Sequence, residues 1–316
     1  GGIRVYKNIS SLAEGLKFSL ITNQVNAEQD GSYTNLYVTG VDYPALSDID
    51  NDGDLDVLSF HILGTFLSYY RNRSMELYGN CDSLNFVREE YCWGNISEGS
   101  NNNKITLHIT CPLFAKKEWG SGKDSAKPLQ IEHTGSTLMA IDLNDDSLKD
   151  LLIGDVDYSG LIGLVNGGTP TDADIISQDT AFPSYDNSVK VFSLPVSSCM
   201  DIDNDGRKDL LVSPFDASLA ISENKKSCLL YKNTGTTTSP VFEYQYNDFL
   251  QRDMIETGSG AYPVLFDYDG DGLKDLFIGN FGTYDSSYYS GGFLYSVFVS
   301  KVALYKNTGT DSFPAF

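Results

Sequence analysis

The chain has 316 residues, enough for a large core in one or two domains. Acidic residues outnumber basic ones by 43 to 22, which gives a formal net charge of −21. This balance argues against nucleic acid or an anionic membrane surface as a partner. No apolar run reaches the length of a membrane span. We therefore predict no nucleic-acid partner and no membrane insertion.

The first 40 residues are predicted to be an incomplete repeat unit. Tyr6-Lys7-Asn8 is a weaker form of a phrase that is complete at 231–236 and again at 305–310, where it reads Tyr-Lys-Asn-Thr-Gly-Thr. Pro and Phe follow both complete copies at the same distance. The phrase belongs to the second half of a unit, so residues 1–40 are expected to form a half unit. Further units are expected upstream of them.

Nine-residue acidic loops recur four times along the rest of the chain. They read DIDNDGDLD from residue 48, DLNDDSLKD from 142, DIDNDGRKD from 201 and DYDGDGLKD from 267. Asp or Asn stands at the first, third, fifth and ninth places, and Gly at the sixth place in three copies. Alternate residues of a tight turn can direct carboxylates at one centre, and Ca²⁺ takes roughly 6–8 oxygen ligands. The spacing predicts up to four calcium sites.

The predicted ligands are the odd-numbered places of each loop, with the seventh residue using its backbone carbonyl. They are Asp48, Asp50, Asp52, Asp54 and Asp56 in the first loop, Asp142, Asn144, Asp146, Leu148 and Asp150 in the second, Asp201, Asp203, Asp205, Arg207 and Asp209 in the third, and Asp267, Asp269, Asp271, Leu273 and Asp275 in the fourth. The second loop has Asn144 in place of Asp and Ser147 in place of Gly. Its site is expected to be the weakest or empty.

The flanking residues distinguish these loops from EF-hands. An EF-hand has a bidentate Glu at the twelfth place and a helix on each side, whereas the twelfth place here is Ser, Ile or Val. Short apolar runs such as Leu276–Gly279 follow the loops, and strand-like segments such as Tyr262–Phe266 precede them. These runs are typical of buried strands. Each loop is therefore predicted to connect two neighbouring strands.

Each unit is predicted to be a four-stranded antiparallel meander. Its order is strand, acidic loop, strand, turn, strand, Asn-Thr-Gly turn and strand, because Asn-Thr-Gly-Thr is turn material. The loops start 94, 59 and 66 residues apart, which suits one such unit each plus insertions. Repeated four-stranded sheets predict an all-β fold, a β-propeller. The predicted single domain, 1–316, contains the half blade and then blades at 41–130, 131–190, 191–258 and 259–316, the last clipped at its end.

Two insertions interrupt this pattern. Residues 76–133 contain three cysteines, Trp93 and Trp119, and residues 283–292 contain three tyrosines. Long loops on a rigid scaffold often carry binding sites. Aromatic rings there could stack on sugars, although packing between blades is their commoner use.

The five cysteines contain no CxxC pair, which argues against a zinc site. We expect one disulfide within Cys81, Cys92 and Cys111, with the pairing left open by the sequence. Cys199 and Cys228 are compatible with buried free thiols. A disulfide together with calcium loops of low affinity favours an extracellular compartment.

Catalytic motifs are not evident in the sequence. His61, His108 and His133 share no motif, and no GxSxG, HExxH or P-loop pattern occurs. A hydrolase or lyase needs a convergent base, acid and substrate clamp. The chain is therefore predicted not to be an enzyme, and calcium is expected to clamp strand connections rather than activate a substrate.

The DxDxDGxxD loop, followed by an apolar strand ending in Gly, resembles the FG-GAP/VCBS repeat of integrin α-subunit propellers and of many bacterial surface proteins. The Tyr-Lys-Asn-Thr-Gly-Thr phrase is similar to bacterial secreted FG-GAP proteins that use type IX secretion. Over essentially the whole chain, the resemblance implies a ring of usually seven blades, Ca²⁺ in the loops and a secreted or cell-surface location. It implies an adhesion or protein-interaction module, or a secretion cargo that contacts the secretion machinery. A lectin or a polysaccharide-active enzyme is the alternative.

Overall fold

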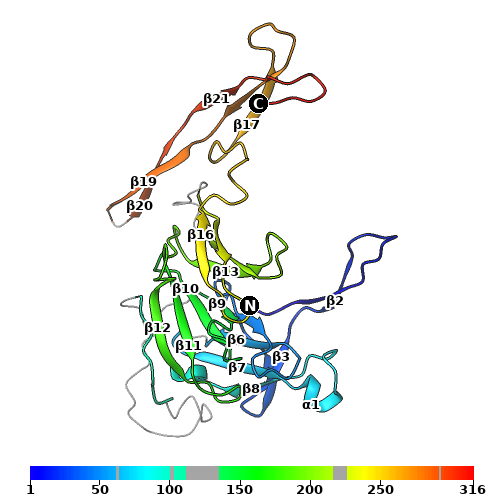
Figure 1. Cartoon of the computed structure of the whole chain (residues 1–316), viewed down its shortest axis with the longest axis vertical. Coiled ribbons are helices and arrows are strands. Elements are labelled where there is room, and N and C mark those ends of the chain that lie inside the picture. Colours follow the sequence, from blue (N-terminus) through cyan, green and yellow to red (C-terminus); the bar gives the residue numbers. More distant parts are fainter. Residues whose placement is uncertain (62–63, 100–102, 112–134, 216–225, 292) are drawn as a thin grey trace. The chain divides into compact units, whose positions relative to one another are not determined.

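The computed structural model describes residues 1–61, 64–99, 103–111, 135–215, 226–291 and 293–316 (Figure 1). These residues form the strands β1–β21, one short helix, α1 (Ser74–Tyr78), and one 3-10 turn, η1 (Trp93–Asn95). The predicted all-β class is confirmed. Within the described residues, no helix has the length and apolar character needed to cross a membrane.

The chain divides into two compact units. The first contains residues 1–215 with 231–244, and the second contains residues 216–230 with 245–316.

Two four-stranded antiparallel meanders match the predicted repeat. One contains β9 to β12 and the other β13 to β16, and each strand lies beside its neighbours in the sequence (Figure 1). The four-stranded architecture is therefore confirmed for these two repeats. Their strands are β9 (Ser136–Ile141), β10 (Asp150–Asp155), β11 (Leu161–Asn166), β12 (Ile175–Phe182), β13 (Pro195–Met200), β14 (Asp209–Pro214), β15 (Leu229–Asn233) and β16 (Phe242–Tyr246).

A third meander, β5 to β8, is extended by an earlier hairpin. Strand β3 pairs antiparallel with β4 and parallel with β8, which gives the sheet order β4-β3-β8-β7-β6-β5. The residues before this hairpin form a separate antiparallel pair, β1 with β2. These strands are β1 (Val5–Asn8), β2 (Phe18–Thr22), β3 (Asn26–Gln29), β4 (Ser32–Asn35), β5 (Ala45–Ser47), β6 (Asp56–Phe60), β7 (Leu67–Asn72) and β8 (Phe86–Glu90).

The strand that follows the second loop is buried on both faces. Leu151, Leu152 and Ile153 of β10 are each 0% exposed. Because successive strand residues point to opposite faces, both faces of this strand are covered. A Cβ atom on Gly154 would lie 2.0 Å from the carbonyl oxygen of Pro195. Gly154, the next-to-last residue of β10, therefore lets the backbone of the next sheet approach closely.

The first strands of successive sheets lie side by side. The backbone N–H of Tyr43, just before β5, donates to the carbonyl oxygen of Ser136 at 3.0 Å. The Thr137 hydroxyl of β9 donates to the carbonyl oxygen of Pro195 in β13 at 2.6 Å. Successive sheets of the first unit thus meet through their first strands, as the blades of a propeller do.

The insertion after β8 contributes to the core of the first unit. Trp93, Ile96 and Ile105 are at most 2% exposed. They pack among apolar side chains of β6, β7, β10, β11 and β12. Trp93 therefore packs between sheets and offers no free ring face. Trp119 and His133, which belong to the same insertion, lie outside the described residues.

The second unit contains a three-stranded antiparallel sheet and a separate hairpin. The sheet order is β17-β18-β21, and β19 pairs with β20. Most of the predicted insertion at 283–292 is strand β19, so it is part of a hairpin rather than an irregular loop. Tyr288 stacks on Tyr295 across this hairpin, with ring centroids 5.5 Å apart. The strands are β17 (Tyr262–Phe266), β18 (Asp275–Gly279), β19 (Thr283–Ser290), β20 (Phe293–Val299) and β21 (Val302–Tyr305).

Candidate metal centres

Each acidic loop connects two neighbouring strands of a sheet, as the sequence predicts. The first loop joins β5 to β6, the second β9 to β10, the third β13 to β14, and the fourth β17 to β18. All four strand pairs are antiparallel. The loops are therefore tight connections between hydrogen-bonded strands. The pairing of the two strands holds the two ends of each loop at a fixed separation.

The ninth residue of each loop closes the loop onto its own sheet. Its Oδ2 accepts the backbone N–H of the second loop residue at 2.8–3.2 Å. Its Oδ1 accepts the backbone N–H of an asparagine at the end of the third meander strand at 2.7–2.9 Å. The pairs are Asp56 with Asn72, Asp150 with Asn166, Asp209 with Asn233, and Asp275 with Asn307.

These ninth-place carboxylates are at most 2% exposed. Burial is the largest cause that raises the pKa of Asp56 to about 7 and the pKa of Asp150 to about 6. Both carboxylate oxygens already accept hydrogen bonds from the backbone, which work against the rise. The ninth residue therefore has a structural role in each repeat, because its carboxylate links the loop to the third strand. This role is separate from any bond that it makes to a cation.

The first residue of each loop shapes the turn. Its Oδ2 accepts the N–H of the sixth residue at 3.0–3.2 Å in all four loops. That sixth residue has a positive φ, between 87° and 103° in the three glycines and 67° in Ser147. Glycine adopts such φ values without steric cost, whereas serine does not. The predicted preference for Gly at this place thus has its reason in the backbone.

The fifth residue of each loop accepts a further backbone hydrogen bond. Its Oδ1 accepts the N–H of the seventh residue at 2.8–3.0 Å. The seventh residues differ in what their side chains do. Asp54 accepts the N–H of Met75 at 2.9 Å, and Arg207 donates to the Asp205 carboxylate at 2.5 Å.

The first loop holds buried carboxylate oxygens that lack hydrogen-bond donors. Among the described residues, no donor contacts Oδ1 of Asp50, Oδ2 of Asp52 or Oδ1 of Asp54. The Asp50 side chain is only 5% exposed, and burial, followed by the charge of Asp52, raises its pKa to about 6. Oxygen atoms of Asp48, Asp50 and Asp56 lie within 4.8 Å of one another. Because buried polar atoms are normally satisfied, this donor set fits a bound hard cation.

The third and fourth loops bring carboxylates together beside a lysine. Ligand atoms of Asp201, Asp203 and Asp209, and likewise of Asp267, Asp269 and Asp271, lie within 4.8 Å of one another. Lys232 donates to Asp203 and lies 3.7 Å from an oxygen of Asp205. Lys306 donates to Asp269 and lies 3.8 Å from an oxygen of Asp271. Both lysines belong to the Tyr-Lys-Asn phrase, so this phrase delivers a cationic side chain to the loop.

The second loop satisfies more of its own oxygens. The Asn144 side-chain amide donates to Asp146 at 2.9 Å, and its Oδ1 accepts the Asp146 N–H at 3.2 Å. Asp142 accepts three backbone N–H groups. The residue that corresponds to Lys232 is Val165, one place before the asparagine of the third strand. The loop with the neutral third ligand therefore also lacks the basic neighbour.

One acidic residue outside the nine-residue pattern joins the first loop. A carboxylate oxygen of Glu76, in helix α1, lies within 4.8 Å of oxygens of Asp50 and Asp52. Nothing in the loop pattern could have indicated this residue, because Glu76 follows the loop's ligands by 20 or more positions in the sequence. Only the folded meander brings the two segments together.

The predicted disulfide is present, and the structure fixes its pairing as Cys92 with Cys111. Cys81 is free and exposed, and Cys199 and Cys228 are free and partly buried. Burial raises the pKa of the Cys199 thiol to about 12. The expectation of one disulfide among three clustered cysteines is confirmed.

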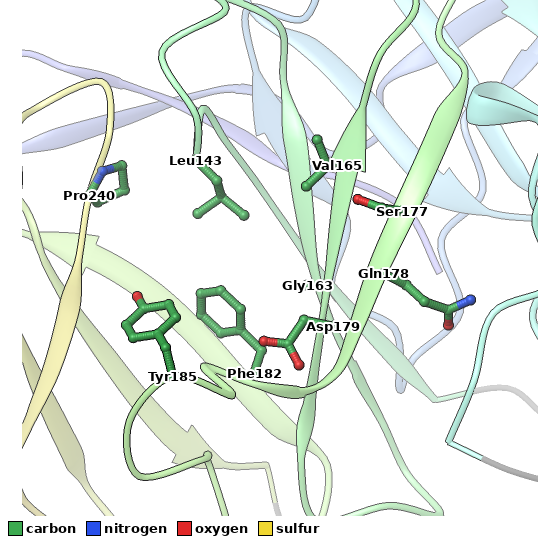
Figure 2. Close-up of a pocket in the computed structure, with 9 residues that line it drawn as sticks. All are labelled: Leu143, Gly163, Val165, Ser177, Gln178, Asp179, Phe182, Tyr185 and Pro240. Atoms are coloured by element: carbon green, nitrogen blue, oxygen red, sulfur yellow. The ribbon is translucent and has the colours of Figure 1, made fainter.

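A small aromatic pocket lies beside the second loop, and Leu143 of that loop is part of its lining. It has a volume of about 230 Å³, and Figure 2 shows Phe182, Tyr185 and Asp179 directed toward one space, with Leu143 and Pro240 opposite. The Asp179 carboxylate accepts backbone N–H groups from Ala181 and Ser184, and the Tyr185 hydroxyl accepts the N–H of Phe242. The pocket thus offers ring faces, while its polar groups are held by the backbone.

Comparison with known proteins gives one family match. Residues 201–278 match the model of the FG-GAP-like repeat, a stretch that runs from the third loop into the strand after the fourth. The comparison with curated proteins gives no match. Among solved structures, an Agrocybe aegerita lectin described as recognising non-reducing terminal N-acetylglucosamine aligns with a TM-score of 0.31 and 15% identity, covering 95% of this chain and 79% of that chain. An FG-GAP-like repeat is therefore present in this chain.

Proposed function

We propose that the chain is a non-enzymatic β-propeller module that binds Ca²⁺ in its acidic loops and attaches its parent protein to a partner protein. The observation that carries the calcium part is the first loop, where Asp50 is buried with an oxygen that no described donor contacts. A buried carboxylate of this kind is costly unless a cation or a donor compensates it.

The residues that would hold the ion are those at the first, third, fifth and ninth places of each loop, which are aspartates except for Asn144 in the second loop. Bound Ca²⁺ would supply positive charge among carboxylates that otherwise repel one another. The chain supplies the rest, because each ninth-place aspartate already accepts one backbone hydrogen bond from its own loop and one from the asparagine that follows the basic or apolar residue of the third strand. The ion then clamps a turn that is nearly formed.

We also propose an extracellular or cell-surface location. The Cys92–Cys111 disulfide suits an oxidising compartment, and loops of this kind suit the calcium concentrations found outside cells. Export as a bacterial type IX cargo is a further proposal, and its support is the resemblance of the Tyr-Lys-Asn-Thr-Gly-Thr phrase.

Glycan binding is the second candidate function, and the aromatic pocket favours it. The rings of Phe182 and Tyr185 line one side of the pocket in Figure 2. Aromatic faces bind the apolar faces of sugar rings. A pocket of about 230 Å³ has room for a single residue of a glycan rather than for an extended chain.

The deciding experiment applies the full chain, with Ca²⁺, to a glycan array and to a polysaccharide depolymerisation assay. Saturable sugar binding that is lost in Tyr185→Ala, but kept in Tyr33→Ala, would establish the second candidate. Tyr33 is a suitable control because it is 64% exposed and outside the pocket. Release of shortened polysaccharide would contradict the non-enzymatic proposal. Neither result is expected under the first proposal.

A further inference from the structure

Helix α1 places an acidic side chain beside the first loop. The helix begins two residues after β7, and the Met75 backbone N–H donates to Oδ2 of Asp54 at 2.9 Å. This bond fixes the helix against the loop. The next residue is Glu76, whose carboxylate then lies within 4.8 Å of ligand oxygens of Asp50 and Asp52. Three oxygens at such separations can surround one hard cation, whose bonds to oxygen measure about 2.3–2.6 Å.

Two carboxylates of this group each have a buried oxygen that lacks a hydrogen-bond donor among the described residues. Oδ1 of Asp50 and Oδ2 of Asp52 are buried, and no described residue donates a hydrogen bond to either atom. The Asp50 side chain is 95% buried, since only 5% of it is exposed. A buried and unpartnered carboxylate oxygen needs a positive neighbour.

The guanidinium of Arg71 is shared among several carboxylates at this position. Arg71 lies 3.0 Å from Glu76 and 3.7 Å from Glu89, and its Nε lies 3.9 Å from Oδ2 of Asp50. One guanidinium therefore serves three carboxylates, while the loop itself contributes further negative charge. The single charge of Arg71 leaves a large negative excess, which a divalent cation would offset.

The third and fourth loops differ from the first in the charged side chains that surround the third-place aspartate. In the third and fourth loops, Lys232 and Lys306 contact the third-place aspartates directly. In both loops, no acidic residue from outside the nine-residue pattern joins the metal-compatible groups found among the described residues. All three loops have a basic neighbour at the third-place aspartate, Arg71, Lys232 or Lys306, and the first loop has an additional carboxylate that the other two lack.

We propose that Glu76 is a ligand of the divalent cation in the first loop, and that this additional carboxylate makes the first loop the tightest of the four sites. The inference rests on the proposed calcium function of the loops and extends it to a residue that the repeat pattern does not contain. The number of charged ligands is a main determinant of calcium affinity. The site is therefore built from two segments, the loop and the helix that follows the third strand.

The test measures the Ca²⁺ affinity of the first loop by chelator competition. The full chain carries Asp203→Asn and Asp269→Asn, which give the third and fourth loops the neutral third ligand that the second loop has naturally. Glu76→Gln in this background is expected to weaken Ca²⁺ binding at least tenfold. The matched control is Glu89→Gln, because Glu89 also contacts Arg71 but is absent from the ligand group. It is expected to change the affinity less than twofold.

The outcomes separate this inference from the proposed function. Affinity that is unchanged in Glu76→Gln, or lowered equally in Glu89→Gln, would overturn the role of Glu76 while leaving calcium binding intact. A background protein that binds no Ca²⁺ would instead overturn the calcium proposal itself. Thermal melts in EDTA are expected to be the same for the background and both Gln variants, since Glu76 and Glu89 are both on the surface, with 38% and 39% of the side chain exposed.

Discussion

The carboxylates of a single loop have two distinct roles. In the first loop, Asp56 accepts hydrogen bonds from the Ile49 N–H, the Asn72 N–H and the Tyr69 hydroxyl. Asp50 has a buried oxygen that no described residue contacts. The ninth place is therefore required by the fold, and we propose that the third place is required by a bound cation. The sequence pattern treats the two positions alike, and only the hydrogen bonds separate them.

Substitution at these two positions is expected to have different effects on stability without metal. Asp56→Ala leaves buried donors unsatisfied, at about 1–3 kcal/mol each, so the free energy of unfolding in EDTA should fall by about 3 kcal/mol. Asp50→Asn removes a buried charge whose contact with Arg71 is long, at 3.9 Å, so stability in EDTA should not fall. Calcium should then stabilise Asp50→Asn less than the native chain. Urea unfolding with and without Ca²⁺ measures both effects, and an equal loss in EDTA for the two variants would refute this division of roles.

The cysteines are expected to differ sharply in reactivity. Only the thiolate is alkylated, and at pH 8 a thiol whose pKa is raised to about 12 by burial, as in Cys199, is almost entirely protonated. Iodoacetamide should modify the exposed Cys81 at least about a hundredfold faster than Cys199. Cys92 and Cys111 should react only after reduction. Peptide mass spectrometry follows each site, and rapid modification of Cys92 without reductant would contradict the disulfide.

At the scale of one element, the third strand of each meander controls its own loop. It ends in the asparagine that binds the ninth-place aspartate, and the residue before that asparagine is Arg71, Val165, Lys232 or Lys306. The basic members contact the third-place aspartate, with distances up to 3.9 Å. Where that place is Asn144, the strand supplies Val165. The charge of the loop and that of the strand thus change together.

The lysine of the third strand is expected to compete with the cation. Lys232→Met should tighten Ca²⁺ binding at the third loop about threefold, a modest effect because the Lys232–Asp203 pair is partly exposed and screened by solvent. Chelator competition on a chain with Asp50→Asn and Asp269→Asn isolates this loop. Lys208→Met is the control, because no ion pair of Lys208 with a loop carboxylate occurs among the described residues, and should change the affinity less than twofold. A weaker site in Lys232→Met would show that the lysine supports the ion instead.

Much of this element could be predicted from the sequence. Apolar runs bounded by turn residues give the strands, and the regular acidic spacing gives the loops between them, because both signals are local. The Tyr-Lys-Asn phrase was recognisable as a repeat, but its role was not. That role depends on Lys232 lying opposite Asp203, 29 residues earlier in the chain.

Other features could not be predicted from the sequence, because they also depend on contacts between segments that are distant in the chain. The parallel pairing of β3 with β8 joins segments that are distant in sequence, and no local pattern specifies such a partner. Glu76 reaches the first loop only because helix α1 returns beside it. The pairing of Cys92 with Cys111, rather than with Cys81, depends on how the insertion packs. Trp93, expected either to pack or to stack on sugars, is 2% exposed and packs.

At the scale of the whole molecule, stability depends on contacts between successive sheets. Strand β10 is buried on both faces, and Gly154 lets the carbonyl of Pro195 approach it. Each acidic loop lies at the end of such a strand pair. Calcium in the loops would therefore stabilise the turns that hold these sheets in register, and its effect should appear in the melting of the molecule as a whole.

The most direct test compares the melting temperature of the full chain in EDTA with that in saturating Ca²⁺. A ligand at a concentration of about a hundred times its Kd raises the free energy of unfolding by about 2.7 kcal/mol per site. We expect Ca²⁺ to raise the melting temperature by about 5 °C or more, and Mg²⁺ at the same concentration to raise it far less. The same melting temperature in EDTA and in Ca²⁺ would contradict the claim that these loops are calcium clamps.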